Sequence, residues 1–157
     1  MMAGCLPSGI PIDRDAIQKP LVENALVALI RVVNIPQLNK SLLENAAITL
    51  GRMGLVMPDA VAPKLETFAE AALAALRNVP DHADKEQAFF GINAMIKLNP
   101  TAILRCFVYY VDAIASWLHV NPKLEAEFGT ILVGYKNSLG DQWHALYASF
   151  PPPLQIC

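Results

Sequence analysis

Apolar residues recur every three to four positions along nearly the whole chain, which is the spacing of one face of an α-helix. No stretch alternates apolar and polar residues for long enough to predict a strand. The pattern therefore predicts an all-α protein. We expect its helices at residues 13–33, from 41 to the break before 57, and at 57–78, 83–98, 99–119, 121–139 and 141–149.

Short polar and proline-containing segments mark the predicted helix boundaries. Ser41 and Glu44 form a Ser-x-x-Glu pattern, which predicts a capping box at the start of the second helix. Asn-Pro pairs at 99–100 and 121–122 predict two further starts, because asparagine caps helices and proline fits the first turn. The three prolines that follow Phe150 lack backbone N–H groups and cannot continue a helix. We expect an extended tail at 151–157.

The predicted helices also repeat. Similar tripeptides at 15–17, 59–61 and 101–103 occupy equivalent helix starts, with spacings of 44 and 42 residues. That period is typical of HEAT repeats, in which antiparallel helix pairs of roughly 40 to 47 residues stack on their neighbours. The sequence therefore predicts an α-solenoid of about three HEAT repeats over residues 13–150, preceded by a disordered segment at 1–12.

An apolar residue interrupts the polar stripe of the second helix. Ser41, Asn45 and Arg52 share one face, and Ile48 lies between them on the same face. In a solenoid of helix pairs, the second helix of each pair lines the concave side, which is the usual binding surface. Ile48 is therefore either buried against a neighbouring helix or exposed as an apolar anchor for a ligand. The pattern alone leaves both interpretations open.

Composition and charge narrow the classes of partner. The 157 residues are 54% hydrophobic and 17% charged, which is ample for the core of one domain. The formal net charge is -2 and there is no basic cluster, so we expect no direct nucleic-acid binding. Cys5, Cys106 and Cys157 are few and far apart, which predicts free thiols and a reducing compartment. No segment predicts a signal peptide or a membrane span.

No cluster of residues predicts catalysis, a metal or a cofactor. The segment GTILVGYKNS at 129–138 approaches a phosphate-binding loop, but Tyr135 displaces the lysine and no strand precedes it. His82, His119 and His144 share no metal-ligand spacing. We therefore expect a binding protein without cofactors. The alternative from another class, an α-helical enzyme, needs a polar cluster that the sequence does not show.

Several distinctive strings occur in one order: NKSLLENAAITLGRMGLVMPDAVAP, LRNV, DKEQAFFGINAMIKLNP, DAIASW, GYKNSLGDQW and FPPPL. Over roughly residues 38–154 they closely resemble the C-terminal HEAT repeats of the transportin family, the karyopherin-β2 nuclear import receptors of the importin-β superfamily. The likeness has departures. Ala71 and Ala72 replace the usual Pro-Trp, and Phe90 stands where an arginine is common.

The resemblance implies a function. Members of this family carry cargo bearing proline-tyrosine nuclear localisation signals, shuttle between cytoplasm and nucleus, and release cargo when the GTPase Ran binds. It implies that this chain is a C-terminal cargo-binding portion, which would meet Ran and nucleoporins through N-terminal repeats that it does not contain. It maps Asn45 and Ile48 to cargo contacts, with Ser41 and Arg52 beside them on the same face. The alternative is a freestanding HEAT scaffold without import activity.

Two further expectations follow from the repeats that the resemblance implies are missing. One isoleucine anchor supplies only about 1.5 to 3 kcal/mol before ordering costs. We therefore expect an affinity for a signal peptide no better than on the order of 10 to 100 μM. The apolar face of the first helix pair, including Leu21, Leu26 and Val27, would be uncovered, so we also expect self-association.

Overall fold

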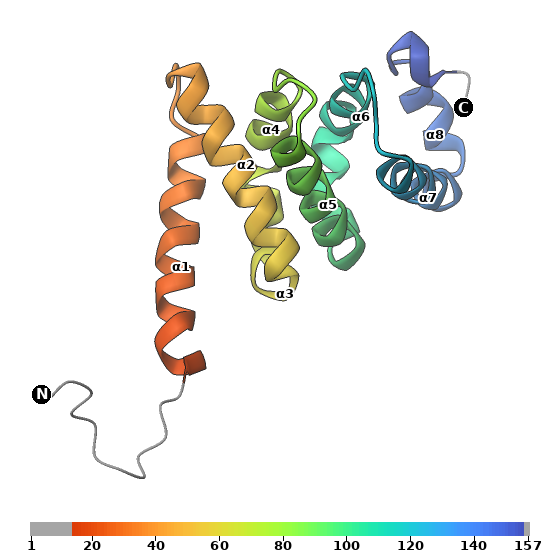
Figure 1. The fold of residues 1–157 in the computed structure, drawn as a ribbon. Helices are drawn as coiled ribbons and strands as arrows, with labels where there is room; N and C mark the ends of the chain where they lie inside the picture. The colour runs from red at the N-terminus through yellow and green to blue at the C-terminus, as the bar shows by residue number, and fades with distance from the viewer. Residues whose placement is uncertain (1–13, 156–157) are drawn as a thin grey trace, which may run out of the picture.

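The computed structural model describes residues 14–155, which form α-helices and 3₁₀ turns and contain no strand within that range. The predicted disordered segment at 1–12 lies outside the described residues. The helices follow one another in a row from α1 to α8 (Figure 1). This architecture confirms the predicted all-α solenoid. The elements in chain order are α1 (Arg14–Val33), α2 (Lys40–Val56), α3 (Pro58–Val61), η1 (Ala62–Lys64), α4 (Leu65–Leu76), α5 (Ala83–Leu98), η2 (Pro100–Cys106), α6 (Phe107–Ala115), α7 (Pro122–Leu139), α8 (Asp141–Tyr147) and η3 (Pro152–Leu154).

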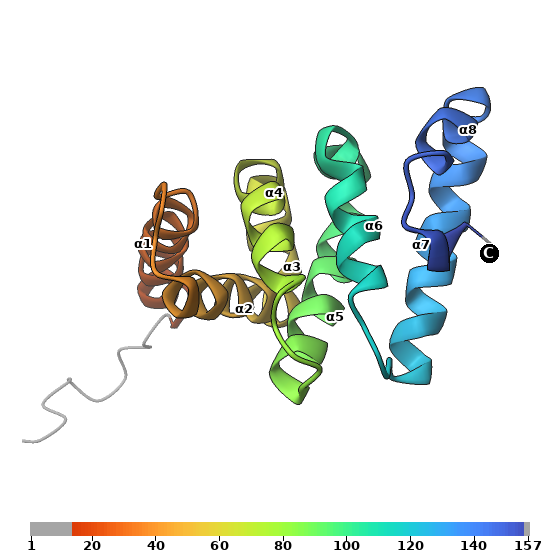
Figure 2. The ribbon, with the colours of Figure 1, turned by 90° about the horizontal axis from the view of Figure 1, so that it is seen from above.

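The helices form two layers. In the first-helix layer α1 contacts α4, and α4 contacts α6. In the second-helix layer α2 contacts α5, and α5 contacts α7. Figure 2 shows the row from above, with α1, α4 and α6 towards one side and α2 and α5 towards the other. The core fills the space between the layers, and its largest fully buried side chains include Phe68, Phe89, Phe107 and Tyr110.

The predicted capping box is wrong. Helix α2 begins at Lys40, and Asn39 is its N-cap, with Oδ1 accepting a hydrogen bond from the backbone N–H of Leu42 at 3.2 Å. Ser41 lies inside the first turn, and Glu44 forms an ion pair of 3.8 Å with Lys40. Asparagine caps a helix at least as well as serine, so the helix starts at the earlier residue.

The two Asn-Pro pairs differ in what the asparagine does. Asn121 caps α7 as predicted, because its Oδ1 accepts from the backbone N–H of Lys123 at 2.8 Å. Asn99 makes no side-chain cap for η2. Its Nδ2 instead donates to the carbonyl oxygen of Ala62 at 2.9 Å, so this side chain ties one helix pair to the preceding one.

Two of the predicted helices are divided in the structure. The predicted helix at 57–78 separates into α3, η1 and α4. Pro63 lies at this break and has no backbone N–H, so the α-helical hydrogen bond at that position cannot form. The predicted helix at 99–119 begins as the 3₁₀ turn η2, continues as α6 and ends at Ala115. Both divisions fall in the predicted first helix of a pair, and α2, α5 and α7 are continuous.

The predicted extended tail forms a turn in its described part. Residues Pro152–Leu154 make the 3₁₀ turn η3, in which the N–H of Leu154 donates to the carbonyl oxygen of Pro151 at 2.9 Å. Leu154 also packs against the core. The two backbone donors of this turn belong to Leu154 and Gln155, neither of which is a proline. Prolines that stop an α-helix are therefore compatible with this turn.

Helix α1 is covered on one side. Leu26 is buried, with 3% of its surface exposed, so the prediction that it is uncovered is wrong. Leu21 and Val27 are exposed over 63% and 44% of their surfaces, as expected. These two side chains leave apolar surface on α1, and self-association through it stays a prediction.

Candidate functional site

The four residues predicted to contact a ligand lie along α2, in the second-helix layer. Ser41, Asn45 and Arg52 are exposed, and Ile48 is half-buried. The buried face of the same helix carries Ala46, Ala47, Leu50, Gly51 and Gly54. The helical periodicity of the sequence therefore placed the polar stripe on the solvent side of α2.

Ile48 is neither fully buried nor fully exposed, so each of the two interpretations of the sequence is partly met. Its side chain packs against the hydrophobic core, and part of its surface remains accessible. Asn45, less than one turn earlier, is exposed, and its carbonyl oxygen accepts a hydrogen bond from the Thr49 hydroxyl at 2.8 Å. Ile48 can therefore offer an apolar contact at the rim of the core beside a polar side chain.

Arg52 connects α2 with the first turn of α5. Its guanidinium Nη1 lies 3.8 Å from Oδ1 of Asp84, and both side chains are about half exposed, at 54% and 51%. An ion pair exposed to this degree contributes little to stability, and water or a ligand competes with it readily. Arg52 is thus positioned by α5 while remaining available to a partner.

Glycines let α2 and α5 approach closely just beside Arg52. A Cβ atom added to Gly51 would lie 2.7 Å from Cα of Ala88, and one added to Gly91 would clash with the carbonyl oxygen of Gly51. Real Cβ atoms do not reach such distances, so the crossing requires glycine at both positions. Close backbone approach fixes the distance between these two helices and with it the spacing of Arg52 and Asp84.

Further along the same layer the surface is hollowed. A groove of about 590 Å³ runs over α5 between α3 and α7. Its lining is formed by Leu55, Pro58, Asp59, Phe90, Ala94, Lys97, Leu98, Lys123 and Glu127. The sequence alone does not predict this groove, because its residues come from four helices. The one available signal was the series Ile48, Arg52 and Leu55, whose i, i+4, i+7 spacing continues the predicted stripe into the groove.

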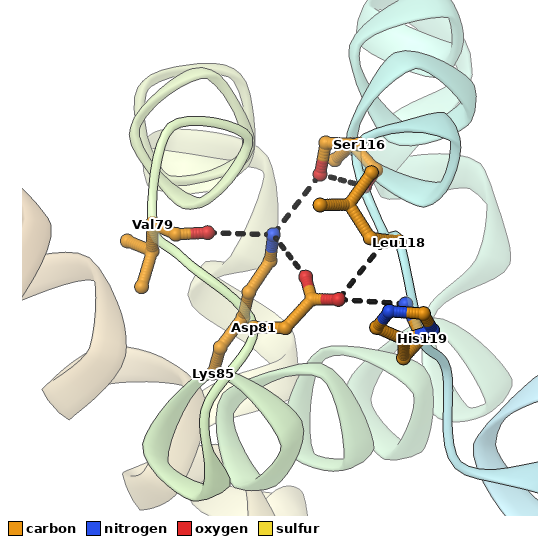
Figure 3. A network of polar contacts seen from close by, with 7 residues as sticks. Val79, Asp81, Lys85, Ser116, Leu118 and His119 are labelled. Carbon is orange, nitrogen blue, oxygen red and sulfur yellow. Dashed lines mark hydrogen bonds and ion pairs between the residues drawn. The ribbon is translucent and has the colours of Figure 1, made fainter.

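A buried polar network holds the start of α5 (Figure 3). Lys85, of which 1% is exposed, donates from Nζ to the carbonyl oxygen of Val79 at 2.7 Å and to the hydroxyl of Ser116 at 3.1 Å. The same Nζ lies 3.8 Å from Oδ1 of Asp81 and 4.7 Å from the ring centroid of Trp117. The network joins the second helix pair to the end of α6.

Asp81 completes this network towards the α6–α7 loop. Its Oδ2 accepts from the backbone N–H groups of Leu118 at 2.9 Å and His119 at 2.7 Å. Burial opposes ionisation, yet the pKa of Asp81 is lowered, because these two donors and the charge of Lys85 stabilise the carboxylate. Burial lowers the pKa of Lys85, an effect that Asp81 partly opposes. Both groups are committed to structural contacts.

A second polar group lies between α5 and α7. Asn93 is fully buried, and its Oδ1 accepts a hydrogen bond of 2.7 Å from the Tyr110 hydroxyl. Its Nδ2 donates to Oε1 of Glu127 at 3.2 Å, and Oε2 of Glu127 lies 3.8 Å from Nζ of Lys97. Burial raises the pKa of Tyr110 well above its usual value, which keeps the hydroxyl protonated as a donor.

No group of three or more histidine, cysteine, aspartate or glutamate side chains within residues 14–155 is arranged to hold a metal ion. Burial raises the pKa of the Cys106 thiol to about 11, so the nucleophilic thiolate is disfavoured. The GTILVGYKNS segment lies within helix α7 and forms no loop, in agreement with the prediction that it does not bind phosphate as a loop. No described helix has the length and apolar character needed to cross a membrane.

Comparison with known proteins finds relatives that align with most of this chain. The chain is 40% identical over 147 residues to Transportin-1 of Homo sapiens, an alignment that covers 93% of this chain and 16% of that protein. It is 37% identical over 137 residues to Transportin of Dictyostelium discoideum, covering 87% of this chain and 15% of that protein. It is 33% identical over 116 residues to Importin subunit beta-2 of Schizosaccharomyces pombe, covering 74% and 12%.

No protein-family model matches the chain. The chain spans about one sixth of the length of the transportins that it matches. Identity of 33 to 40% along most of the chain, in three distant eukaryotes and on a helical-repeat fold, identifies common ancestry. The chain therefore belongs to the transportin family of nuclear import receptors, as a homologue of a segment of its members.

Proposed function

We propose that the second-helix layer of this chain binds cargo of the nuclear import pathway, in the form of an extended peptide from a proline-tyrosine nuclear localisation signal. The observation that carries the proposal is the pairing, on one accessible edge of α2, of an exposed Asn45 with a half-buried Ile48. Membership of the transportin family supports a role of the chain in nuclear import.

The two side chains supply complementary contacts. An extended peptide presents unpaired backbone N–H and C=O groups, and the Asn45 amide can both donate to and accept from them. Ile48 offers apolar surface to a peptide side chain, worth at most about 1.5 to 3 kcal/mol on full burial. Arg52 and Ser41 extend the polar edge on either side. Contacts of this number support binding on the order of 10 to 100 μM.

Location and further partners follow from the family. We propose that the chain acts in the cytoplasm and the nucleus. Contacts with Ran and nucleoporins belong, on this proposal, to repeats of the longer relatives outside the aligned sixth. A freestanding HEAT scaffold without import activity is the competing function, and it makes no contact with localisation signals.

The test is fluorescence anisotropy of a labelled proline-tyrosine signal peptide titrated with the full chain at physiological salt. Asn45→Ala and Ile48→Ala are each expected to weaken binding by about three- to tenfold, the loss of about 0.7 to 1.4 kcal/mol. Since Ile48 also packs on the core, thermal unfolding of each variant verifies that the fold survives.

Val108→Ala is the matched control for Ile48→Ala. Val108 is an aliphatic residue of α6 in the first-helix layer, with 40% of its surface exposed. Its truncation should leave the affinity unchanged. Absence of saturable binding, or equal losses in Val108→Ala and Ile48→Ala, would instead leave the scaffold function.

A further inference from the structure

The groove over α5 has properties that the contacts of Asn45 and Ile48 do not use. Its volume of about 590 Å³ lies within the range of sites that accept small molecules and single peptide side chains. Leu55 and Leu98 on its rim are exposed over 41% and 54% of their surfaces. Phe90 and Ala94, one turn apart on α5, are half-buried in it. These four side chains form an apolar patch along the groove.

The charged residues of the groove differ in whether they are paired. Lys97 and Glu127 neutralise one another at 3.8 Å. Lys123 lies over the ring of Phe90, with Nζ 6.0 Å from the ring centroid, and has no carboxylate partner among residues 14–155. Asp59 likewise has no cationic partner in that range. One positive and one negative charge thus remain available to a ligand.

These two charges lie on opposite sides of the apolar patch. Asp59 belongs to α3 and Lys123 to the first turn of α7, and α5 runs between these helices (Figure 1). A ligand that crosses α5 therefore meets a negative charge, then apolar surface, then a positive charge. Lys123 is also at the positive end of the α7 dipole, where an added carboxylate is favoured.

We propose that this groove binds an extended peptide segment in which an aliphatic residue is flanked by a basic residue on one side and an acidic residue on the other. The aliphatic side chain contacts Phe90 and Ala94, the acidic one pairs with Lys123, and the basic one pairs with Asp59. The segment is chemically distinct from a proline-tyrosine signal. The site therefore adds a second recognition surface to the same layer and does not depend on the proposed cargo contact at Asn45 and Ile48.

The experiment is an amide-resolved NMR titration of the full chain with the peptide acetyl-Gly-Arg-Ala-Leu-Ala-Glu-Gly-amide. Shift changes are expected at Leu55, Phe90, Ala94, Leu98 and Lys123. Replacing the peptide's leucine with glycine should abolish them. Shift changes confined to Thr101, Leu104 and Leu139, which line a separate apolar groove between η2 and α7, would overturn the proposal.

A charge reversal separates direct pairing from a structural effect. Lys123 is exposed, so Lys123→Glu should fold normally. It should raise the dissociation constant for the Arg-Leu-Glu peptide by about five- to tenfold, since an attraction becomes a repulsion. A peptide with lysine in place of its glutamate should bind Lys123→Glu as tightly as the original pair. Binding that ignores both changes would exclude the assigned contact.

Discussion

Helix α5 has two different neighbours in its layer. On one side its backbone at Gly91 touches the backbone of α2 at Gly51. On the other side large side chains separate α5 from α7. Across the second junction Phe89 packs edge-on against Phe128, with ring centroids 5.6 Å apart, and Asn93 donates to Glu127. The α2–α5 junction has no room for a methyl group at the crossing, whereas the α5–α7 junction leaves two grooves, of about 590 and 530 Å³.

The comparison shows how one layer of helices can combine a closely packed crossing with accessible grooves. Small residues bring backbones together and exclude ligands from the α2–α5 crossing. Large and polar residues hold α5 and α7 at a greater distance, so side chains on both helices keep accessible surface. The two grooves of this layer lie where the helices are held apart by specific contacts, beside a crossing that fixes their geometry.

The largest expected effect on stability comes from disrupting the α2–α5 crossing. Gly91→Ala places a methyl group against the Gly51 carbonyl, so α2 and α5 must move apart. We expect a loss of about 3 kcal/mol in the free energy of unfolding, at the upper end for overpacking. Urea denaturation followed by circular dichroism measures it.

The control for this prediction lies on α7. A Cβ at Gly134 would meet nothing within 4 Å. Gly134→Ala should therefore stabilise the protein by up to about 1 kcal/mol through helix propensity. Equal destabilisation by the two substitutions would contradict the assignment of the tight crossing to Gly91.

The next largest effect concerns the polar network at the start of α5. Lys85→Met keeps the aliphatic length but removes both hydrogen bonds and leaves Asp81 without its cation. We expect a loss of about 2 to 3 kcal/mol. Arg77→Met breaks the 2.6 Å ion pair with Asp112 at a half-exposed site and should lose no more than about 1 kcal/mol. Comparable losses would show that burial of Lys85 matters less than its charge.

A smaller effect on stability is expected from the buried hydrogen bond to Asn93, at the α5–α7 junction. Tyr110→Phe removes the donor to the buried Oδ1 of Asn93 and should lower the free energy of unfolding by about 1 to 2 kcal/mol. Tyr109→Phe, at the adjacent exposed position, should change it by less than about 0.5 kcal/mol. Chemical denaturation of the two variants compares the loss of a buried hydroxyl with the loss of an exposed one. An unchanged free energy of unfolding in Tyr110→Phe would show that the hydrogen bond to Asn93 does not stabilise this junction.

The smallest effect is a dependence on pH. The native pKa of Asp81 lies below its ordinary value of 3.8, so its ionised form stabilises the folded state above that value. The contribution is lost as the pH falls through the lower, native pKa. Thermal unfolding of the unmodified chain and of Asp81→Asn should therefore differ most near neutral pH and converge as the pH falls through the native pKa of Asp81. A gap that widens on acidification would reverse the assigned sign.

Much of the helical framework could be predicted from local sequence. The start and end of α5 and of α7 follow from apolar periodicity and from nearby proline and asparagine residues, and the structure places them within one or two residues of the prediction. The stripe of Ser41, Asn45 and Arg52 was placed on an accessible face of α2 for the same reason. These features depend on contacts between residues close in the chain, which sequence patterns record directly.

Competition between nearby signals accounts for the local errors. Asn39 and Ser41 are both good N-caps two residues apart, and their energies differ too little for a pattern to choose between them. A local pattern also could not predict the role of Asn99. Its side chain donates a hydrogen bond to the carbonyl oxygen of Ala62 in the preceding helix pair and does not cap its own helix.

The sequence by itself determined an all-α chain of paired helices, because the 3.6-residue period and the helix-stopping residues act locally. Tertiary structure decided which faces meet, and with that the tight Gly51–Gly91 crossing, the half-burial of Ile48 and the groove around Phe90. Each of these depends on the distance between helices far apart in the chain. That distance is set by the packing of many side chains at once, so no single stretch of sequence encodes it.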